Sequence, residues 1–449
     1  MNTAVLRMKL FFLIGGISLA TYGQSYLGFN TDNYSGLHGV LSNPGNIADA
    51  RIRADINLFS LSVLGANDYV SLSLDNISEF VEGSDFLGLD KNPSDSNNLL
   101  ANLEVLGPSF MFKFKQNQSI GLITRVRAIN NYLNFNGEFF EALLDGFPDT
   151  EFDFQQNDFD GTSHVWAEIG VSYGRILFDD RNRNFLKGGI TVKFLAGFGF
   201  SQVYSTQLSG SLNMDNQTVE LNGDFSNTSN VEDTLENHDL FRNLAPGIGF
   251  DIGFVYEFRT RSSQSFNGRE NPDAVNNYRF KLGVSLLDFG AITYRDIVLE
   301  RYVLNGAIDV AAAEDDIILA IEDNFPEIRD SGDVTTALPT SLNVNIDYKF
   351  TSDLYLNLDV NQTLVNKDKF FNNNRLNLIS LTPRFERRKL GFYLPIGYST
   401  LGKYSMGVGV KLGPLILGSG SILGNVLTTS TQTANFYMGF KAPLHYKRK

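Results

Sequence analysis

The sequence LKGGITVKFLAGFGF, residues Leu186–Phe200, decides the fold of this chain. Every even-numbered position is apolar or glycine, whereas Lys187 and Lys193 stand at odd-numbered positions. Side chains on a β-strand alternate between its two faces, so this stretch predicts a strand with one uncharged apolar face and one lysine-bearing face. At about 3.3 Å per residue the strand is roughly 50 Å long. Such length and patterning are typical of a membrane-spanning barrel wall, with its apolar side toward lipid.

The same alternation recurs along most of the chain. The clearest further strands are predicted at 110–115, 120–127, 164–173, 248–259, 342–350 and 354–361. Others are expected at 54–63, 69–75, 278–287, 375–385, 389–398, 404–412, 415–421 and 433–441. Because closed bacterial barrels have an even number of strands, we predict an all-β, antiparallel transmembrane barrel of about 14 strands, with about 12 or 16 as alternatives.

The connections between these strands alternate between short and long. Tight turns are expected near 116–118, 179–184, 351–353, 386–388 and 399–403, and long loops at 129–162, 202–246, 261–277 and 295–340. This sidedness is typical of outer-membrane barrels. Apolar spacing predicts short loop helices at 137–146 and 310–321, packed within the loops, and 202–225 is consistent with a hairpin at the rim.

The first residues resemble a secretory signal. Arg7 and Lys9 precede the apolar run Leu10–Ala20, which is too short to span a membrane as a helix, and cleavage is expected near Gly23. An uncleaved anchor is the alternative. We therefore predict a signal peptide at 1–23 and export to the cell outer membrane, where the barrel contacts lipid. The chain has no cysteine, which excludes disulfides and lipid attachment at a cysteine.

Residues 24–53 lack the alternation, and we predict that they form an N-terminal plug ahead of a barrel at 54–449. Their turn motif is Asn43-Pro44-Gly45. About 14 strands enclose a wide interior, whose polar groups need partners that a folded-in segment would supply. The glycine-rich runs 188–199 and 247–253 lie inside strands, where glycine permits curvature or close packing of a plug. An ordinary loop at the barrel mouth is the alternative.

Polar side chains on the face opposite the apolar one form the predicted lumen lining. These residues are Lys113, Lys115, Arg125, Arg127, Lys187, Lys193, Asp251, Glu257, Asn343, Asp347, Asn357 and Asp359. The early strands contribute cations, and the later strands contribute carboxylates and amides. Two interpretations stay open: the groups pair with one another and with the plug, or they line a polar path for a solute.

The composition argues against several function classes. A net charge of −13 opposes nucleic-acid binding, which needs basic grooves. The chain has four histidines, and no pair has the spacing of a metal-binding HExxH motif. His164 and Ser163 are adjacent on a strand, so their side chains face opposite ways and cannot form a catalytic pair. We therefore predict no enzyme activity, no cofactor and no metal site.

The order of a signal peptide, an Asn-Pro-Gly motif and a long barrel resembles FadL-type outer-membrane transporters and the related PorV-type secretion barrels. The second half also resembles an uncharacterised barrel family of Bacteroidota outer membranes. That resemblance rests on Ser285–Ile292, Leu338–Val344, Leu381–Phe385 and Gly413–Ser419. It implies a plugged barrel. Gly45 stands where FadL-type proteins usually have alanine.

Two functions follow from the barrel and this resemblance. The first is passive uptake of a hydrophobic or amphiphilic small molecule, as in FadL-type channels. The second is an accessory or structural barrel for protein secretion or surface assembly, which would bind secretion or surface proteins through its long loops. A soluble, β-rich secreted protein is the alternative to the barrel itself.

Overall fold

A computed structural model gives the fold of the protein. It describes residues 25–71, 90–180, 183–230, 244–259, 276–365, 373, 376–428 and 431–446. The predicted signal peptide, most of the strand predicted at 69–75 and nearly all of the loop predicted at 261–277 lie outside these ranges. Within the described ranges, no helix is long and apolar enough to cross a membrane.

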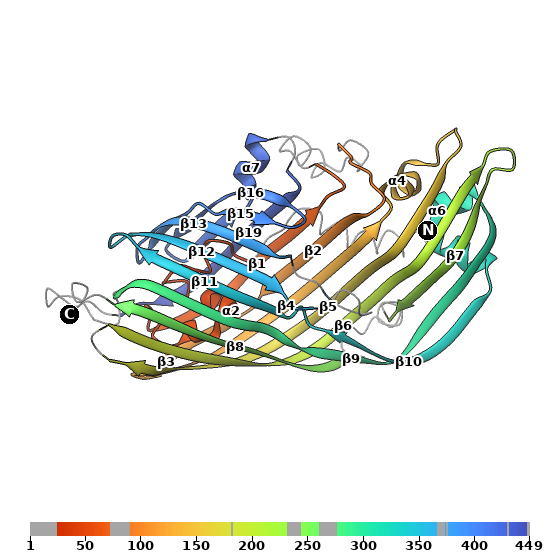
Figure 1. Ribbon diagram of the computed structural model, residues 1–449. Coiled ribbons are helices and arrows are strands. Elements are labelled where there is room, and N and C mark those ends of the chain that lie inside the picture. Colours follow the sequence, from red (N-terminus) through yellow and green to blue (C-terminus); the bar gives the residue numbers. More distant parts are fainter. Residues whose placement is uncertain are drawn as a thin grey trace.

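The chain forms a closed antiparallel β-barrel (Figure 1). Its strand segments are β1 (Ala54–Asn67), β2 (Asn97–Leu106), β3 (Ser109–Lys115), β4 (Gln118–Phe135), β5 (Asp153–Asp179), β6 (Asn184–Asn213), β7 (Thr218–Ser229), β8 (Ala245–Arg259), β9 (Tyr278–Asp309), β10 (Glu327–Ala337), β11 (Ser341–Lys349), β12 (Leu354–Thr363), β13 (Leu378–Glu386), β14 (Leu390–Tyr393), β15 (Ile396–Ser399), β16 (Lys403–Met406), β17 (Val408–Leu412), β18 (Leu415–Ser419) and β19 (Thr433–Leu444). The barrel closes where β19 pairs with β1.

Several segments are two pieces of one barrel strand. β2 and β3 both pair with β1 and β4, and they are separated by Gly107 and Pro108. In the same way β7 and β8 both pair with β6 and β9. β10 and β11 both pair with β9, and β14 and β15 both pair with β13. β16 and β17 pair with these last two pieces in turn. Proline cannot donate to a ladder, which accounts for the breaks at Pro108 and at Pro395. The 19 segments therefore make 14 barrel strands, which confirms the predicted number.

The outer face of the barrel is apolar. Exposed side chains on neighbouring strands include Ile169, Ile190, Phe194, Ile252 and Phe254. The residues between them on the same strands, such as Lys193 and Asp251, are buried. This is the pattern expected of a barrel with lipid outside and polar groups within. The fold is that of an outer-membrane β-barrel.

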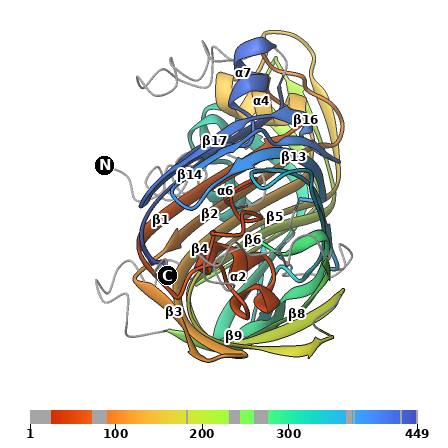
Figure 2. The same cartoon turned by 90° about the vertical axis from the view of Figure 1, so that its left-hand side faces the viewer.

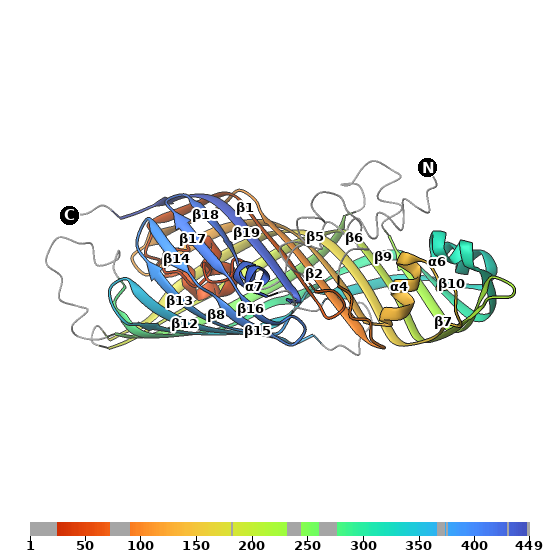
Figure 3. The same ribbon diagram turned by 90° about the horizontal axis from the view of Figure 1, so that it is seen from above.

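Three strands are much longer than a membrane needs. β5, β6 and β9 contain 27, 30 and 32 residues, whereas one pass takes about 9–11. Together with β7 and β10 they continue past the barrel as an extension, residues 136–163, 201–229 and 295–337, seen at the right in Figures 1 and 3. The extension has its own apolar core, which includes Phe154, Val219 and Leu304.

The prediction of long loops at 129–162, 202–246 and 295–340 is therefore wrong for most of their described residues. These segments hold the ends of β4, β5, β6 and β9, all of β7 and β10, and two helices. β2 was also not predicted. The hairpin within 202–225 is confirmed by the pairing of β6 with β7. The helices are α4 (Gly137–Asp145) and α6 (Val310–Asn324), as predicted, and Ala313 and Ile321 of α6 pack into the core of the extension.

A β-bulge in β6 separates the barrel from the extension. Val165 pairs with Gly199, but Trp166 pairs with Gly197, so Phe198 is an extra residue. An extra residue moves all later side chains to the other face. Phe194 is 58% exposed, whereas Phe200 is fully buried. The expectation that all even-numbered residues of Leu186–Phe200 share the outer face is thus wrong at Phe200.

The N-terminal segment, residues 25–53, lies inside the barrel, where Figure 2 shows it encircled by strands. It contains α2 (Leu37–Ser42) and the 3-10 helix η1 (Pro44–Ile47). Phe29, Leu37 and Ile47 are fully buried. A further helix, α7 (Ile422–Leu427), lies between β18 and β19.

Candidate functional site: two cavities beside the N-terminal segment

The turn of the N-terminal segment is seated on glycines of the barrel wall. Gly174, Gly189 and Gly253 are direct cross-strand neighbours on β5, β6 and β8. A side chain added at any of the three would overlap the segment: Ile47 at Gly174, the Pro44 backbone at Gly189 and the Asn43 side chain at Gly253. Glycine at these positions therefore lets the turn approach the wall closely.

Asn43 fastens this turn to the wall. Its Oδ1 accepts a hydrogen bond from the Gly45 backbone N–H at 2.9 Å, which caps η1. Its Nδ2 donates to the carbonyl oxygens of Phe254 on β8 and Val284 on β9, at 3.1 and 3.3 Å. A single side chain thus orders the turn and ties it to two strands.

Charged groups hold the segment to the other side of the barrel. Asp32 forms an ion pair with Lys411 of β17 at 2.7 Å and accepts a hydrogen bond from the Tyr393 hydroxyl of β14. Lys441 of β19 donates to the Ser35 carbonyl oxygen at 2.6 Å and pairs with Asp55 at 2.9 Å. Since β14, β17 and β19 are far around the barrel from β8, the segment is fixed from both sides.

The ion pair of Asp32 determines its protonation. Burial by itself would raise the pKa of the Asp32 carboxyl, but the Lys411 ammonium and the Tyr393 hydroxyl outweigh burial and lower that pKa below its ordinary value. Asp32 is therefore ionised at neutral pH. By contrast, burial and the nearby Lys441 charge lower the pKa of His38 well below its ordinary value, so His38 is neutral.

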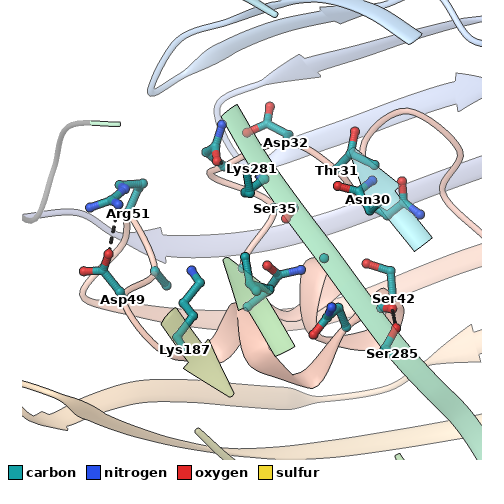
Figure 4. A pocket seen from close by; sticks show the side chains of 18 of the residues that line it. Asn30, Thr31, Asp32, Ser35, Ser42, Asp49, Arg51, Lys187, Lys281 and Ser285 are labelled. Carbon is teal, nitrogen blue, oxygen red and sulfur yellow. Dashed lines mark hydrogen bonds and ion pairs between the residues drawn. The ribbon is translucent and has the colours of Figure 1, made fainter. Parts of the chain in front are cut away.

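Two cavities flank the N-terminal segment. The polar cavity has a free volume of about 40 Å³ and is lined by the segment and by Lys187, Glu257, Lys281, Ser285 and Asn343, among others (Figure 4). Figure 4 shows Lys187 and Lys281 beside Asp49, Arg51 and Asp32 of the segment. Its lining is dominated by charged and amide groups.

The leucine cavity has a free volume of about 60 Å³. Its apolar wall consists of Leu41, Leu64, Leu100, Ala101, Leu287, Leu376 and Leu378. Polar groups also line it, namely Ser25, Asn30, His38, Ser42, Asn102, Glu104, Arg125, Asn131 and Asn361. Asn30 and Ser42 line both cavities, so the N-terminal segment stands between them. Along β9 the polar cavity reaches Ser285, and the leucine cavity is lined by Leu287, which is nearer to the extension.

Ten of the twelve predicted lumen residues are buried in the interior. These are Arg125, Arg127, Lys187, Lys193, Asp251, Glu257, Asn343, Asp347, Asn357 and Asp359. Lys113 and Lys115 instead lie by the turn between β3 and β4, where Lys115 is exposed and Lys113 half-buried. The pairing of β3 with β4 shifts register between Lys113 and Lys115, so the alternation ends there, and the prediction that both line the lumen is wrong for Lys115.

Many of the buried charges pair with one another. Lys193 contacts Asp251 at 2.6 Å and Asp288 at 2.5 Å, and Arg127 contacts Asp288 at 2.9 Å. Arg125 pairs with Glu168 and, at 2.9 Å, with Glu104. Early-strand cations therefore meet later-strand carboxylates, as the pairing interpretation expects. A solute path remains a prediction.

Several interior charges were not among the predicted site residues: Glu104, Glu168, Asp288, Arg384, Glu386, Lys411 and Lys441. Glu168 and Asp251 occupy the same inner face of alternating strands, so face assignment could have found Glu168. Glu104 lies on β2, whose sequence NNLLANLEVL has no clear alternation. Arg384, at 2.6 Å from Asp347, lies in a predicted strand whose faces were not assigned.

His164 is part of the aromatic interior. Its Nε2 is 2.9 Å from the Tyr294 hydroxyl, and its Nδ1 is 2.7 Å from Asn373 Nδ2. Both ring nitrogens thus have structural partners. Within the described ranges, no group of three or more acidic or histidine side chains is placed to hold a metal ion.

Fold and sequence together define the class of this protein: an outer-membrane β-barrel with a chain segment inside. The chain belongs to a family of unknown function (DUF5723), whose sequence profile matches residues 44–420. The match begins at Pro44 of the seated turn. No curated protein matches the sequence.

The fold is similar to solved FadL-type barrels. The toluene transporter TbuX of Ralstonia pickettii has 12% identity over 96% of this chain and 100% of its own, with a TM-score of 0.47. The toluene transporter TodX of Pseudomonas putida has 9% identity over 96% and 100%, with a TM-score of 0.49. A FadL homologue of Pseudomonas aeruginosa has 10% identity over 95% and 100%, with a TM-score of 0.43. The predicted distant likeness of an uncharacterised family to FadL-type barrels is confirmed.

Proposed function

We propose that this protein is a passive channel that takes up a hydrophobic or amphiphilic small molecule across the outer membrane. In this proposal the N-terminal segment is the plug that closes the channel at rest. The carrying observation is that Asn30 and Ser42 line both cavities. A molecule that moves from the leucine cavity to the polar cavity must therefore pass this segment.

The way in which the segment is held supports a movable closure. It is tied to the wall by hydrogen bonds and ion pairs, and its turn rests on glycines rather than between interlocking side chains. Hydrogen bonds exchange readily with water, so these ties can be broken at small net cost. The apolar contacts of Leu37 and Ile47 with Met111 and Ile123 are what keep the segment closed at rest. The polar side chains that it would uncover, such as Lys281 and Asn343, suit an aqueous channel.

The test is channel conductance in planar lipid bilayers. The full chain is compared with a variant that lacks residues 25–53 and with a variant carrying Lys411→Met, which leaves Asp32 without its ion-pair partner. We expect the full chain to be mostly closed, the deletion to conduct steadily and Lys411→Met to open intermittently. Equal, low conductance of all three folded proteins would exclude a channel closed by this segment.

Substrate movement is tested in intact Gram-negative cells, because their outer membrane slows hydrophobic probes. Uptake of the fluorescent probe N-phenyl-1-naphthylamine is expected to rise with the full chain compared with cells that lack it. The same probe rate in both cells, despite the barrel reaching the outer membrane, would argue against transport.

A second candidate function is an accessory barrel that binds proteins through the extension. The observation that favours it is the separate apolar core of the extension, which the wall of a simple channel does not need. Removal of β7 and α6 would then abolish partner capture without changing conductance. If the deletion changes conductance and captures the same proteins, this second function is wrong.

A further inference from the structure

The leucine cavity carries buried polar atoms that have no hydrogen-bond partner within the described part of the chain. They include Asn30 Oδ1, Asn102 Oδ1, Glu104 Oε1 and Asn361 Nδ2. Asn30 and Glu104 are 3% and 1% exposed. A buried polar atom without a partner costs free energy, so a cluster of them in one cavity points to a ligand that satisfies them.

Most of these four atoms are hydrogen-bond acceptors. Three are oxygen atoms that can only accept hydrogen bonds, and one is an amide nitrogen that donates. The other oxygen of Glu104, Oε2, accepts from Arg125 at 2.9 Å and from Ser25 Oγ at 3.3 Å. Oε1 is therefore the part of the carboxylate that is left for a ligand. The head of that ligand must be chiefly a hydrogen-bond donor.

The carboxylate at the cavity also favours a cationic head. Glu104 has Oε1 at the cavity, while its other oxygen is bound to Arg125. A cationic donor at Oε1 would form a charge-assisted hydrogen bond, which is stronger than a neutral one. An anionic head would be repelled by the same carboxylate.

We propose that the leucine cavity binds the head of an amphiphile that bears a primary ammonium group. Its three N–H donors match the acceptor oxygens of Asn30, Asn102 and Glu104, and its positive charge strengthens the hydrogen bond to the Glu104 carboxylate. The first carbons of its tail lie against Leu64, Leu100 and the other leucines. About 60 Å³ suits such a head and a short stretch of tail. An anionic head would meet acceptor oxygens and is disfavoured.

This inference rests on the proposed function, because it names the substrate class of the proposed channel. The two can fail separately. Conductance and probe uptake test the channel, whereas direct binding to the full chain tests the head group. A channel that opens on deletion but does not bind an ammonium would contradict this inference alone.

The experiment measures binding of three six-carbon probes to the full chain in lipid nanodiscs. The probes are hexylammonium, 1-hexanol and hexanoate, and empty nanodiscs correct for partition into lipid. Calorimetry is combined with fluorescence of Trp166, the one tryptophan of the chain. Its Nε1 is 3.4 Å from Glu168 Oε2, so it reports on the network that begins at Glu104. We expect saturable hexylammonium binding, at least about tenfold tighter than hexanoate binding.

Two variants locate the site. Asn102→Leu removes one acceptor and keeps the side-chain volume, so hexylammonium binding should weaken about tenfold while hexanol binding is unchanged. Glu104→Gln removes the charge and should weaken hexylammonium further. Glu220→Gln, the same change on the exposed face of the extension, should have no effect. The heat-dependent gel mobility of each barrel checks that it has folded.

Two results would overturn the proposal. Hexanoate binding as tight as hexylammonium binding would show that the oxygens do not select the head group. The absence of saturable binding by all three probes, with unchanged Trp166 fluorescence, would show that the cavity holds water only.

Discussion

The membrane half of the barrel and the extension are built from the same strands but have opposite polarity. In the barrel part of β6, Phe194 faces outward and Lys193 is buried, whereas in the extension Val219 of β7 is buried and Glu220 is exposed. Alternation defines a strand in both regions, but the surroundings decide which residues point inward. Lipid requires an apolar exterior, and water permits an apolar interior.

The polarity of the interior of each region follows from this difference. The barrel interior contains paired charges and the N-terminal segment, whereas the extension is filled by its own apolar side chains. Polar and charged groups therefore line the two cavities beside the N-terminal segment. The following substitutions test this contrast, from the largest expected effect to the smallest.

Removal of a shared interior charge should have the largest effect. Asp288 pairs with both Arg127 and Lys193, and Asp288→Asn leaves these cations without that partner. Asparagine tolerates the positive φ of this residue, so the charge is the main change. We expect a loss of about 3–5 kcal/mol in the free energy of unfolding, measured by urea titration in lipid vesicles. Glu300→Gln, which weakens a pair with the exposed Arg329 on the extension, should cause little measurable loss.

A charge substituted on the outer face distinguishes a position that faces lipid from one that faces water. Phe194→Arg on β6 should lower the free energy of folding into vesicles by about 2–4 kcal/mol, because arginine then faces the hydrocarbon. Gln207→Arg, on an exposed position of the same strand in the extension, should leave it unchanged. Equal losses for the two variants would contradict the assignment of the two regions to lipid and water.

The glycine seat should be sensitive to a single methyl group. Gly253→Ala would push against Asn43, and we expect a cost of about 1–3 kcal/mol together with faster proteolysis of the N-terminal segment. Gly332 of β10 has open space where its side chain would be, so Gly332→Ala is the matched control. If both variants resist protease alike, the turn is not held by the glycine seat.

Low pH should loosen the N-terminal segment through Asp32. The folded pKa of Asp32 is lowered, so its stabilising contribution is complete above the ordinary value of 3.8 and disappears as pH falls through the lowered pKa. Proteolysis of the segment by an acid-active protease should therefore increase only below about pH 4. Asp32→Asn should remove most of that pH dependence.

The strands could be predicted wherever their outer residues face lipid, because lipid requires those residues to be apolar. Along β8, and along β12 from Leu354 to Val360, the outer residues are apolar and alternate regularly with the inner ones. The extension was assigned to loops because water allows polar residues on its outer face, and β10, EIRDSGDVTTA, is polar almost throughout. The bulge at Phe198 is also invisible in the sequence, because it is defined by the pairing of two strands.

The site was predictable only in part. Charges opposite a lipid-facing row, such as Lys193 and Asp251, could be assigned to the interior from their own strand. The partners of the N-terminal segment could not, because Lys411 and Asp32 are separated by most of the chain. The Asn43-Pro44-Gly45 motif predicted a turn, but its seat depends on glycines from three neighbouring strands.

The central claim is that the N-terminal segment separates two cavities inside the barrel, and labelling of single cysteines tests it most directly. The chain has no native cysteine, so Asn102→Cys reports on the leucine cavity and Asn345→Cys on the polar cavity. A membrane-impermeant thiol reagent is added from one side of an oriented vesicle. We predict that Asn102→Cys reacts only from the side of the extension and Asn345→Cys only from the opposite side, until residues 25–53 are removed. Reaction of either cysteine from both sides in the full chain would contradict the claim.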